Sequence, residues 1–494
     1  MHRLLIAAMT VLSFSLVDLA GAGVGPAPGA NLLDGEYWRA QVLNDLIPRW
    51  YEHVRDEKDG AFFMILSRQW QPQPPWDKVP AMVSRQVFGF SAAYLLSGEE
   101  KYLEAAREGA QYLLEHAWDR QYGGWYNSLT QSGAPLDTNK TVALQLYTNV
   151  GLAMYYFTTG DEEVLSRVKR SVEIQQTRAH DPEFDGYYSA LSRDLSPVVG
   201  GKTKHAHYGY VGSLIHLYQT DRDAGLLQFE RHVMDLTATR MTDPQLGWVY
   251  GYLPELDRQW RRLPAGDRDE VLVGAQLTAA LAYLRLAQQS GDVRYAAYGK
   301  ALGDLTVQRG WDAQRGSWRD YVGREPPFAP GPQPTASWWT QIYGAFLQLQ
   351  LYHITADKQY LEQFGKMEKF YVQHFIDSEY GGVFANVTPE GALLGEGNKA
   401  FVWKTSYHEV EHGLLNYLYL NLYVNHKPAV LHFRFNRDRG ARKHFVSLVD
   451  DPAVELAGVR INDQPWTAFD ARERSVSLPA GEDLRVEVTL KPCP

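Results

Sequence analysis

The chain has 494 residues, of which 45% are hydrophobic and 22% are charged, so it can bury a large core and is not dominated by disorder. Its formal net charge of −9 argues against nucleic acid or an anionic membrane as a partner, because both attract basic surfaces. Aromatic residues make up 13% of the chain, including 14 Trp and 30 Tyr, and aromatic faces suit stacking against sugar rings. Composition therefore indicates a large globular protein and hints at a carbohydrate ligand.

The first 22 residues, MHRLLIAAMTVLSFSLVDLAGA, are typical of a secretory signal peptide. Arg3 precedes an apolar run that ends in the small-residue site Ala20-Gly21-Ala22. No later apolar run reaches the roughly 18 residues needed to span a bilayer. Cys493 is the sole cysteine, so no internal disulfide can form. We expect a periplasmic or secreted protein.

A turn-like octad recurs six times and predicts a repeat architecture. Its copies combine Asp, Gly and aromatic residues, as in DRQYGGWY and DSEYGGVF, and begin at Asp56, Asp119, Asp181, Asp243, Asp312 and Asp377. Between octads lie an apolar helical segment and an amphipathic one, such as SRQVFGFSAAYLLSG and EKYLEAAREGAQYLLEHAWD. Six such pairs predict an all-α fold, an (α/α)6 barrel over residues 35–425, with an open solenoid as the alternative.

After residue 425 the pattern changes to alternation of apolar and polar residues, as in AVLHFRF and DLRVEVTL. Gly, Pro and Asp turns separate these runs. Residues 427–494 are therefore predicted to form a small β-sandwich that braces the helical part.

In a barrel of this kind the inner helices start at the same end, so polar residues near their N-termini converge on one funnel. The candidates are Arg85, Lys140, Gln145, Tyr147, His205, His207, Asp267, Asp269, Glu270, Gln276, Trp338, Trp339, Gln341, Lys404, Tyr407, His408 and His412. Each has an alternative structural role: His205 could cap its helix, both tryptophans could be core, and Arg85 could belong to a buried ion pair. His207 and His408 occupy equivalent places in their repeats, which favours a function for both.

Several of these segments resemble the N-acylglucosamine 2-epimerase superfamily, which includes cellobiose 2-epimerases and mannose isomerases. The resemblance spans roughly residues 35–425 and lies in SRQVFGFSAAY, DRQYGGWY, YYFTTGDEEVL, SWWTQIYGAF, DSEYGGVF and, most specifically, WKTSYHEVEH. It implies an (α/α)6 barrel and proton transfer at C2 of an opened mono- or oligosaccharide, without metal or redox cofactor. Two bases of near-neutral pKa on opposite sides of C2 would do this chemistry, for which histidine is suited.

The resemblance also implies roles for individual residues. His408 and His207 match the family's histidines, Arg85 is suited to stabilise the enediolate, and Trp338 and Trp339 could form the sugar platform. The further candidates for substrate binding, which come from their place in the predicted funnel, are Tyr147, Glu270, Gln341 and Tyr407. The chain departs from the family at Asp267, which stands in GDRDE where family members have a histidine; an Asp carboxylate is a much weaker base unless burial raises its pKa.

Three other functions are compatible with parts of the sequence. HEVEH, at residues 408–412, matches the H-E-x-x-H zinc-protease motif, but no third ligand follows at the usual spacing. A glycoside hydrolase or lyase could use Asp267, Asp269 or Glu270 as acid and base. A polysaccharide-binding protein could keep the funnel without catalysis. In each sugar-related case we expect a monomer or homodimer that binds neither nucleic acid nor membrane.

Overall fold

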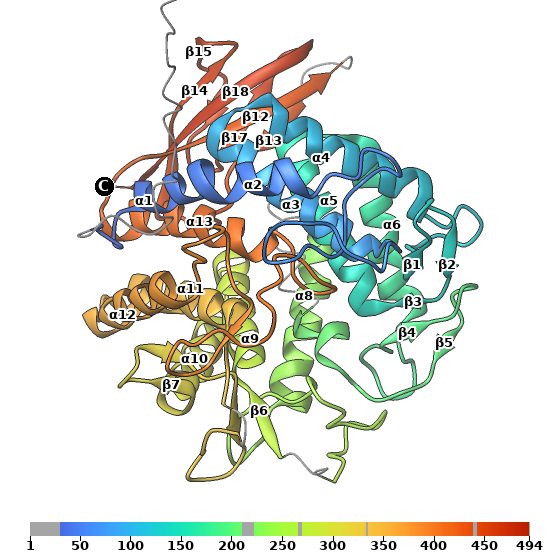
Figure 1. Cartoon of the computed structure of the whole chain (residues 1–494), viewed down its shortest axis with the longest axis vertical. Coiled ribbons are helices and arrows are strands. Elements are labelled where there is room, and N and C mark those ends of the chain that lie inside the picture. The colour runs from blue at the N-terminus through green and yellow to red at the C-terminus, as the bar shows by residue number, and fades with distance from the viewer. Residues whose placement is uncertain (1–29, 210–221, 265–268, 332–333, 438–441, 494) are drawn as a thin grey trace, which may run out of the picture.

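The computed structural model describes residues 30–493 except 210–221, 265–268, 332–333 and 438–441. The predicted signal peptide therefore lies outside the described residues. Helices with short strands between them make up the described chain to residue 424, and strands alone follow, as the sequence predicts (Figure 1). No helix in the described ranges is long and apolar enough to cross a membrane.

The helices fall into a buried and a half-exposed set that alternate along the chain. The buried set comprises α3 (Pro80–Ser97), α5 (Val142–Thr159), α9 (Val273–Ser290), α11 (Trp338–Thr355) and α13 (Tyr407–Tyr419). The half-exposed set comprises α1 (Gly35–Gln41) with α2 (Ile47–His53), α4 (Glu100–Tyr112), α6 (Glu162–Arg178), α8 (Ala224–Leu236), α10 (Val293–Gly310) and α12 (Lys358–His374). The sixth predicted buried helix falls largely on residues 210–221, which are not described.

Burial follows the two sequence patterns. In α3, 17 of 18 residues are buried, whereas in α4 only 7 of 13 are. The uniformly apolar segments are therefore the inner helices and the amphipathic segments cover them, which confirms the assignment made from periodicity.

Short connections join each inner helix to the outer helix that follows. Gly160 ends α5 in the left-handed conformation with φ 67°, which glycine adopts without a Cβ clash. The next residue, Asp161, caps α6 by accepting hydrogen bonds from the backbone N–H groups of Glu163 and Val164. Gly291 and Asp292 repeat this arrangement between α9 and α10.

The six octads form six equivalent hairpins, as predicted. In each one the residue before the Asp pairs in an antiparallel bridge with the residue seven positions later, from Arg55 with Phe62 to Ile376 with Val383. In four hairpins a buried lysine pairs with the octad Asp: Lys78–Asp56, Lys140–Asp119, Lys202–Asp181 and Lys399–Asp377. Lys140 is thus a structural partner of Asp119, at 3.1 Å, and not part of the funnel.

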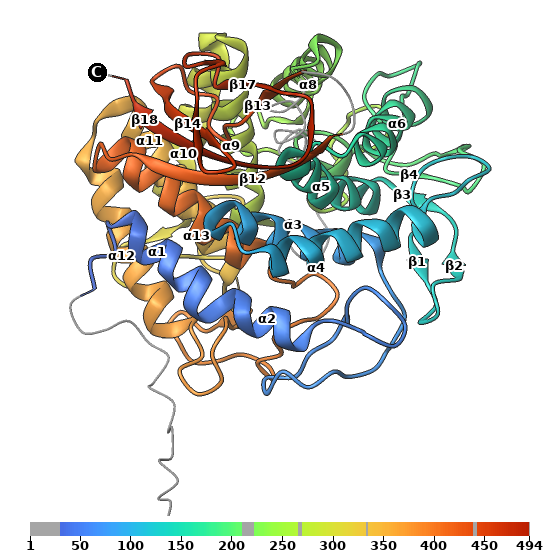
Figure 2. The ribbon, with the colours of Figure 1, turned by 90° about the horizontal axis from the view of Figure 1, so that it is seen from above.

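The inner helices lie side by side around a common centre (Figures 1 and 2). α3 contacts α5 on one side and α13 on the other, and α11 contacts both α9 and α13. The predicted sixth inner helix, which follows α5 and precedes α9 in the sequence, lies largely outside the described residues.

The C-terminal strands form two antiparallel sheets. One has the order β12 (Ala429–Arg437), β18 (Gly481–Pro492), β14 (Val454–Ile461), β15 (Gln464–Trp466); the other has β13 (Arg442–Phe445), β17 (Ser475–Leu478), β16 (Phe469–Asp470). β12 contacts α3 and α5 (Figure 2). The buried loop around Asp450 and Asp451 accepts hydrogen bonds from Gln288 and Gln289 at the C-terminal end of α9. The strand region therefore covers the ends of the inner helices that lie away from the hairpins.

Candidate active site

A cavity of about 420 Å³ lies among the inner helices, within the size range of small-molecule sites. Residues from all five described inner helices line it, together with hairpin residues such as Tyr252 and Trp403. Arg85, Tyr147, Trp338 and His408 enter it from the first two turns of their helices. The predicted convergence of helix N-termini on one site is thus observed for these elements.

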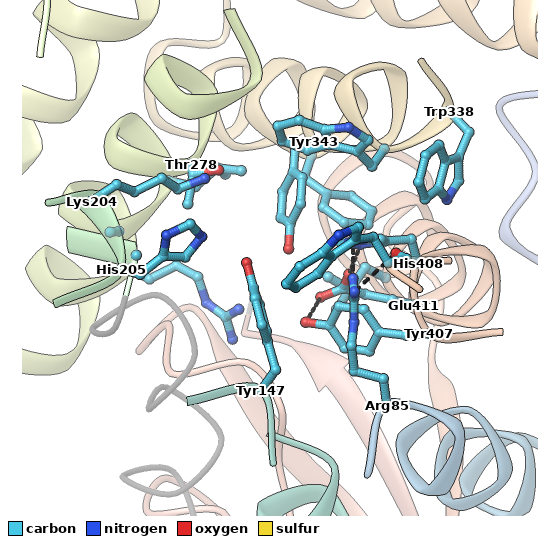
Figure 3. Close-up of a pocket in the computed structure, with 18 of the residues that line it drawn as sticks. Arg85, Tyr147, Lys204, His205, Thr278, Trp338, Tyr343, Tyr407, His408 and Glu411 are labelled. Carbon is cyan, nitrogen blue, oxygen red and sulfur yellow. Dashed lines mark hydrogen bonds and ion pairs between the residues drawn. The ribbon is translucent and has the colours of Figure 1, made fainter. Parts of the chain in front are cut away.

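His408 lies on one wall of the cavity, between Arg85 and Glu411 (Figure 3). An Nη2 of Arg85 is 2.5 Å from Nε2 of His408, and Glu411 Oε2 is 3.3 Å from Nδ1. Because a guanidinium can only donate, Nε2 accepts and the ring proton lies on Nδ1, facing Glu411. Burial, followed by the charges of Arg85, Lys204 and Lys404, holds the pKa of His408 well below its ordinary value. The imidazole is therefore neutral, and its Nε2 lone pair accepts the hydrogen bond from Arg85.

Aromatic rings fix this wall. The ring of Tyr407 lies 4.6 Å from His408, and those of Tyr343 and Trp338 lie edge-on at 5.4 and 6.0 Å. Arg85 stacks over Tyr407 at 4.8 Å and donates to the backbone oxygen of Trp403 at 3.0 Å. His408 and Arg85 are therefore held in one geometry before any ligand binds.

Glu411 is the carboxyl partner of His408. Burial raises its pKa to about 7 although Arg285 and Arg85 oppose the shift. Its Oε1 also accepts from the Tyr407 hydroxyl at 3.4 Å. Three positions separate His408 from Glu411, so both lie on the same face of α13.

Lys204 and His205 lie across the cavity from His408 (Figure 3). They belong to a 3-10 turn, Lys204–Ala206, that follows the third hairpin. Burial lowers the pKa of Lys204 to about 8, and burial with the Lys204 charge lowers that of His205 to about 3. The Tyr147 ring meets His205 edge-on at 5.8 Å, and Tyr147 and Tyr343 point their hydroxyls into the space between the two walls.

The structure places His207 outside the cavity. Its Nε2 accepts from the backbone N–H of Tyr187 at 3.2 Å, and its Nδ1 faces the Thr203 carbonyl at 2.7 Å. Burial lowers its pKa to about 4. Both ring nitrogens are thus used in holding the third hairpin.

Glutamines do the same work in other repeats. Gln145 clamps the backbone N–H and carbonyl of Trp125, Gln276 those of Val249, and Gln341 those of Trp318, at 2.6–2.8 Å. Gln145 and His207 each follow their hairpin partner by 20 residues. Gln341, predicted to bind substrate, is therefore a hairpin clamp in this structure, and His207 occupies the equivalent place.

None of the three acids predicted near the fourth inner helix is a described lining residue of the cavity. Glu270 lies in β6 (Glu270–Leu272), paired with β9 (Tyr321–Gly323), and does not line the cavity. Asp269 accepts from Arg324 at 2.9 Å and Arg262 at 3.3 Å. Asp267 lies outside the described residues. Among the described residues that line the cavity, Glu411 is the one carboxyl group.

Of the H-E-x-x-H motif, His408 lines the cavity, whereas Glu409 and His412 make buried structural contacts. Glu409 accepts from Lys404 at 2.5 Å and from Trp50 Nε1 at 2.9 Å, and His412 lies 2.7 Å from Glu368. Lys404, a predicted funnel residue, therefore pairs with Glu409 and does not line the cavity. In the described part of the chain no group of three or more His, Cys, Asp or Glu residues is arranged to hold a metal.

Several cavity residues were not predicted from the sequence, among them Lys204, Arg285, Tyr343 and Glu411. Glu411 and Tyr343 could have been found, because each lies three or four positions from a predicted residue on the same helix. Arg285 lies on the face of α9 that also carries Thr278 and Leu281, one or two turns deeper. Nothing in the sequence marks Lys204.

Comparison with known proteins identifies related chains. The family model of N-acylglucosamine 2-epimerase (GlcNAc 2-epimerase) matches residues 60–411. The cellobiose 2-epimerase of Bacteroides fragilis is 24% identical over 388 residues, covering 74% of this chain and 94% of the relative. The N-acylglucosamine 2-epimerase of Homo sapiens is 23% identical, covering 72% and 84%.

Among solved structures, the cellobiose 2-epimerase of Spirochaeta thermophila superposes with a TM-score of 0.71 at 22% identity. That match covers 78% of this chain and 96% of the other. A likeness at this identity supports a shared helical fold, and the family match supports common descent. The chain belongs to the N-acylglucosamine 2-epimerase family.

Proposed function

We propose that this protein is a sugar epimerase or isomerase that transfers a proton at C2 of a sugar reducing end. Its family membership supports sugar epimerisation, since the relatives named above are a cellobiose and an N-acylglucosamine 2-epimerase. The observation that carries the mechanism is a pair of neutral imidazoles, His408 and His205, that line the same cavity from opposite sides (Figure 3).

In this mechanism His408 acts as one base. Its Nε2 accepts the C2 proton while Glu411 stabilises the imidazolium through Nδ1–H. Arg85 moves its N–H donors from Nε2 to the sugar oxygens, where they stabilise the negative charge of the enediolate. The short Arg85–His408 hydrogen bond places both groups next to the same reacting atoms.

His205 acts as the second acid/base from the opposite face. Burial lowers its pKa to about 3, and the negative charge of the enediolate, forming beside the ring, raises that pKa so that the imidazole can carry a proton. His205 takes the role that the sequence assigned to Asp267 or His207, because it lines the cavity and His207 does not. Proton return to C2 from this face inverts the centre, whereas return to C1 gives the ketose. Trp339, whose ring is only partly buried, is the platform for the sugar ring, and Trp338 buttresses His408.

The same proposal includes a closed (α/α)6 barrel. Its support is the order of contacts α9, α11, α13, α3, α5 among described inner helices, with one repeat left to complete the ring. The C-terminal strands would brace the closed end. Export to the periplasm or outside the cell, and a monomeric or dimeric state, remain predictions from the sequence.

A glycoside hydrolase is the weaker candidate. That chemistry ordinarily needs two carboxyl groups facing one bond. The described lining has one carboxyl group, that of Glu411, and it is paired with His408.

Incubation of free sugars with the protein in heavy water tests the function. We expect loss of the C2–H signal in proton NMR and appearance of a C2 epimer or ketose for at least one of glucose, mannose, cellobiose, N-acetylglucosamine or glucuronate. Boiled protein serves as the control. Release of new reducing ends from an oligosaccharide without C2 exchange would contradict the proposal and favour hydrolysis.

A further inference from the structure

The described lining of the cavity has more cationic than acidic side chains. Three cationic side chains line it, Arg85, Lys204 and Arg285, against the single described carboxyl group of Glu411. The pKa of Glu411 is raised to about 7, so its negative charge is incomplete at neutral pH. The described lining therefore carries excess positive charge.

Lys204 differs from the other buried lysines of the described chain. Lys78, Lys140, Lys202, Lys399 and Lys404 each form an ion pair with a carboxylate at 2.5–3.1 Å. Lys204 is only 5% exposed, yet its Nζ forms no hydrogen bond or ion pair with any described residue. Lys204 Nζ lies over two aromatic rings, 5.5 Å from the centroid of Trp339 and 5.9 Å from that of Tyr252.

A buried cation without a counter-ion among the described residues is costly, and a bound anion would offset that cost. Lys204 extends into the cavity on the wall opposite His408 (Figure 3). Lys204 and His408 line the same cavity, so one ligand can contact both.

We propose that the substrate is an acidic sugar whose carboxylate binds Lys204 while its reducing end lies between Arg85 and His408. This inference rests on the proposed function and narrows it to the uronic acid class. The Trp339 ring lies beside the Lys204 ammonium and would support the sugar between the two ends. Arg285, on the deeper face of α9, adds to the positive field.

Isothermal titration calorimetry with D-glucuronate and D-glucose tests the charge preference. We expect wild-type protein to bind glucuronate about tenfold or more tightly than glucose, as a charge-assisted contact in a buried site gives. Lys204→Met should remove most of that preference, and Lys204→Arg should keep it. Lys58→Met, which removes the charge of an 84% exposed lysine, is the matched control and should change neither affinity.

Each result decides the matter. Equal affinities for the two sugars in the wild type, or no binding of glucuronate, would overturn the proposal even if Lys204→Met failed to fold. An equal loss of both affinities in Lys204→Met would assign Lys204 a structural role. Tighter binding of glucose 6-phosphate than of glucuronate would reject the carboxylate in favour of a phosphate.

The outcome is separable from that of the proposed function. C2 exchange with neutral sugars but no acid preference would overturn only the acidic substrate. Glucuronate binding without C2 exchange in heavy water would overturn only the epimerase mechanism.

Discussion

The two walls of the cavity are built differently. On the His408 wall, Arg85, Glu411 and Tyr407 hold one another through hydrogen bonds and stacked rings, so the geometry exists before substrate arrives. On the opposite wall, the side chains of Lys204 and His205 make no hydrogen bond to any described residue. The difference indicates that one wall is organised for chemistry, whereas the other completes its contacts with the ligand.

Replacement of His408 should have the largest effect, because it removes the base of the organised wall. His408→Asn is expected to lower kcat by about 100- to 10,000-fold, the usual contribution of a general base. Circular dichroism should show an unchanged helical spectrum. Activity within tenfold of wild type would rule out the role given to His408.

Glu411→Gln should sharpen the description of the same wall. Loss of a charge-assisted hydrogen bond to the imidazolium is expected to lower kcat/KM by about 10- to 100-fold. In the wild type, Glu411 ionises as the pH rises through about 7, so kcat/KM should rise over that range. A pH profile whose rise survives in Glu411→Gln would assign it to another group.

The hairpin clamps should behave as structural parts. Gln341→Leu leaves the buried backbone N–H and carbonyl of Trp318 without their partner, which should cost about 1–3 kcal/mol in the free energy of unfolding. Urea denaturation measures this loss, and kcat below the melting temperature should be unaffected. Loss of activity with unchanged stability would instead show that Gln341 binds substrate.

His207→Gln should have the smallest effect. Glutamine at the equivalent position of other repeats makes the same backbone contact that His207 makes with Tyr187. We expect kcat/KM within about twofold of wild type and a change in unfolding free energy below about 1 kcal/mol. A fall in kcat as large as that of His408→Asn would show that His207 takes part in the chemistry.

The repeat pattern could be predicted from the sequence because it is local. Asp–Gly turns and apolar periodicity predicted the six hairpins and the inner and outer helices, and spacing from helix starts placed Arg85, Tyr147, Trp338 and His408 in one cavity. These inferences need only the helical period and the direction of each helix.

The choice between His205 and His207 could not be made in this way. Both precede the same predicted helix, and the resemblance to the family favours His207. Which one reaches the cavity depends on the 3-10 turn at Lys204–Ala206 and on the backbone partner that Tyr187 supplies. Likewise, pairing of Lys140 with Asp119 is a tertiary contact between residues 21 positions apart, which the helical pattern does not reveal.

The central claim is that proton transfer occurs from two sides of one cavity, and the products of His205→Asn in heavy water test it most directly. With His408 intact, the account predicts that the C2–H of a sugar turned over by the wild type still exchanges for deuterium, while formation of the C2 epimer is lost. Epimer formation at the wild-type rate in this variant would contradict the account.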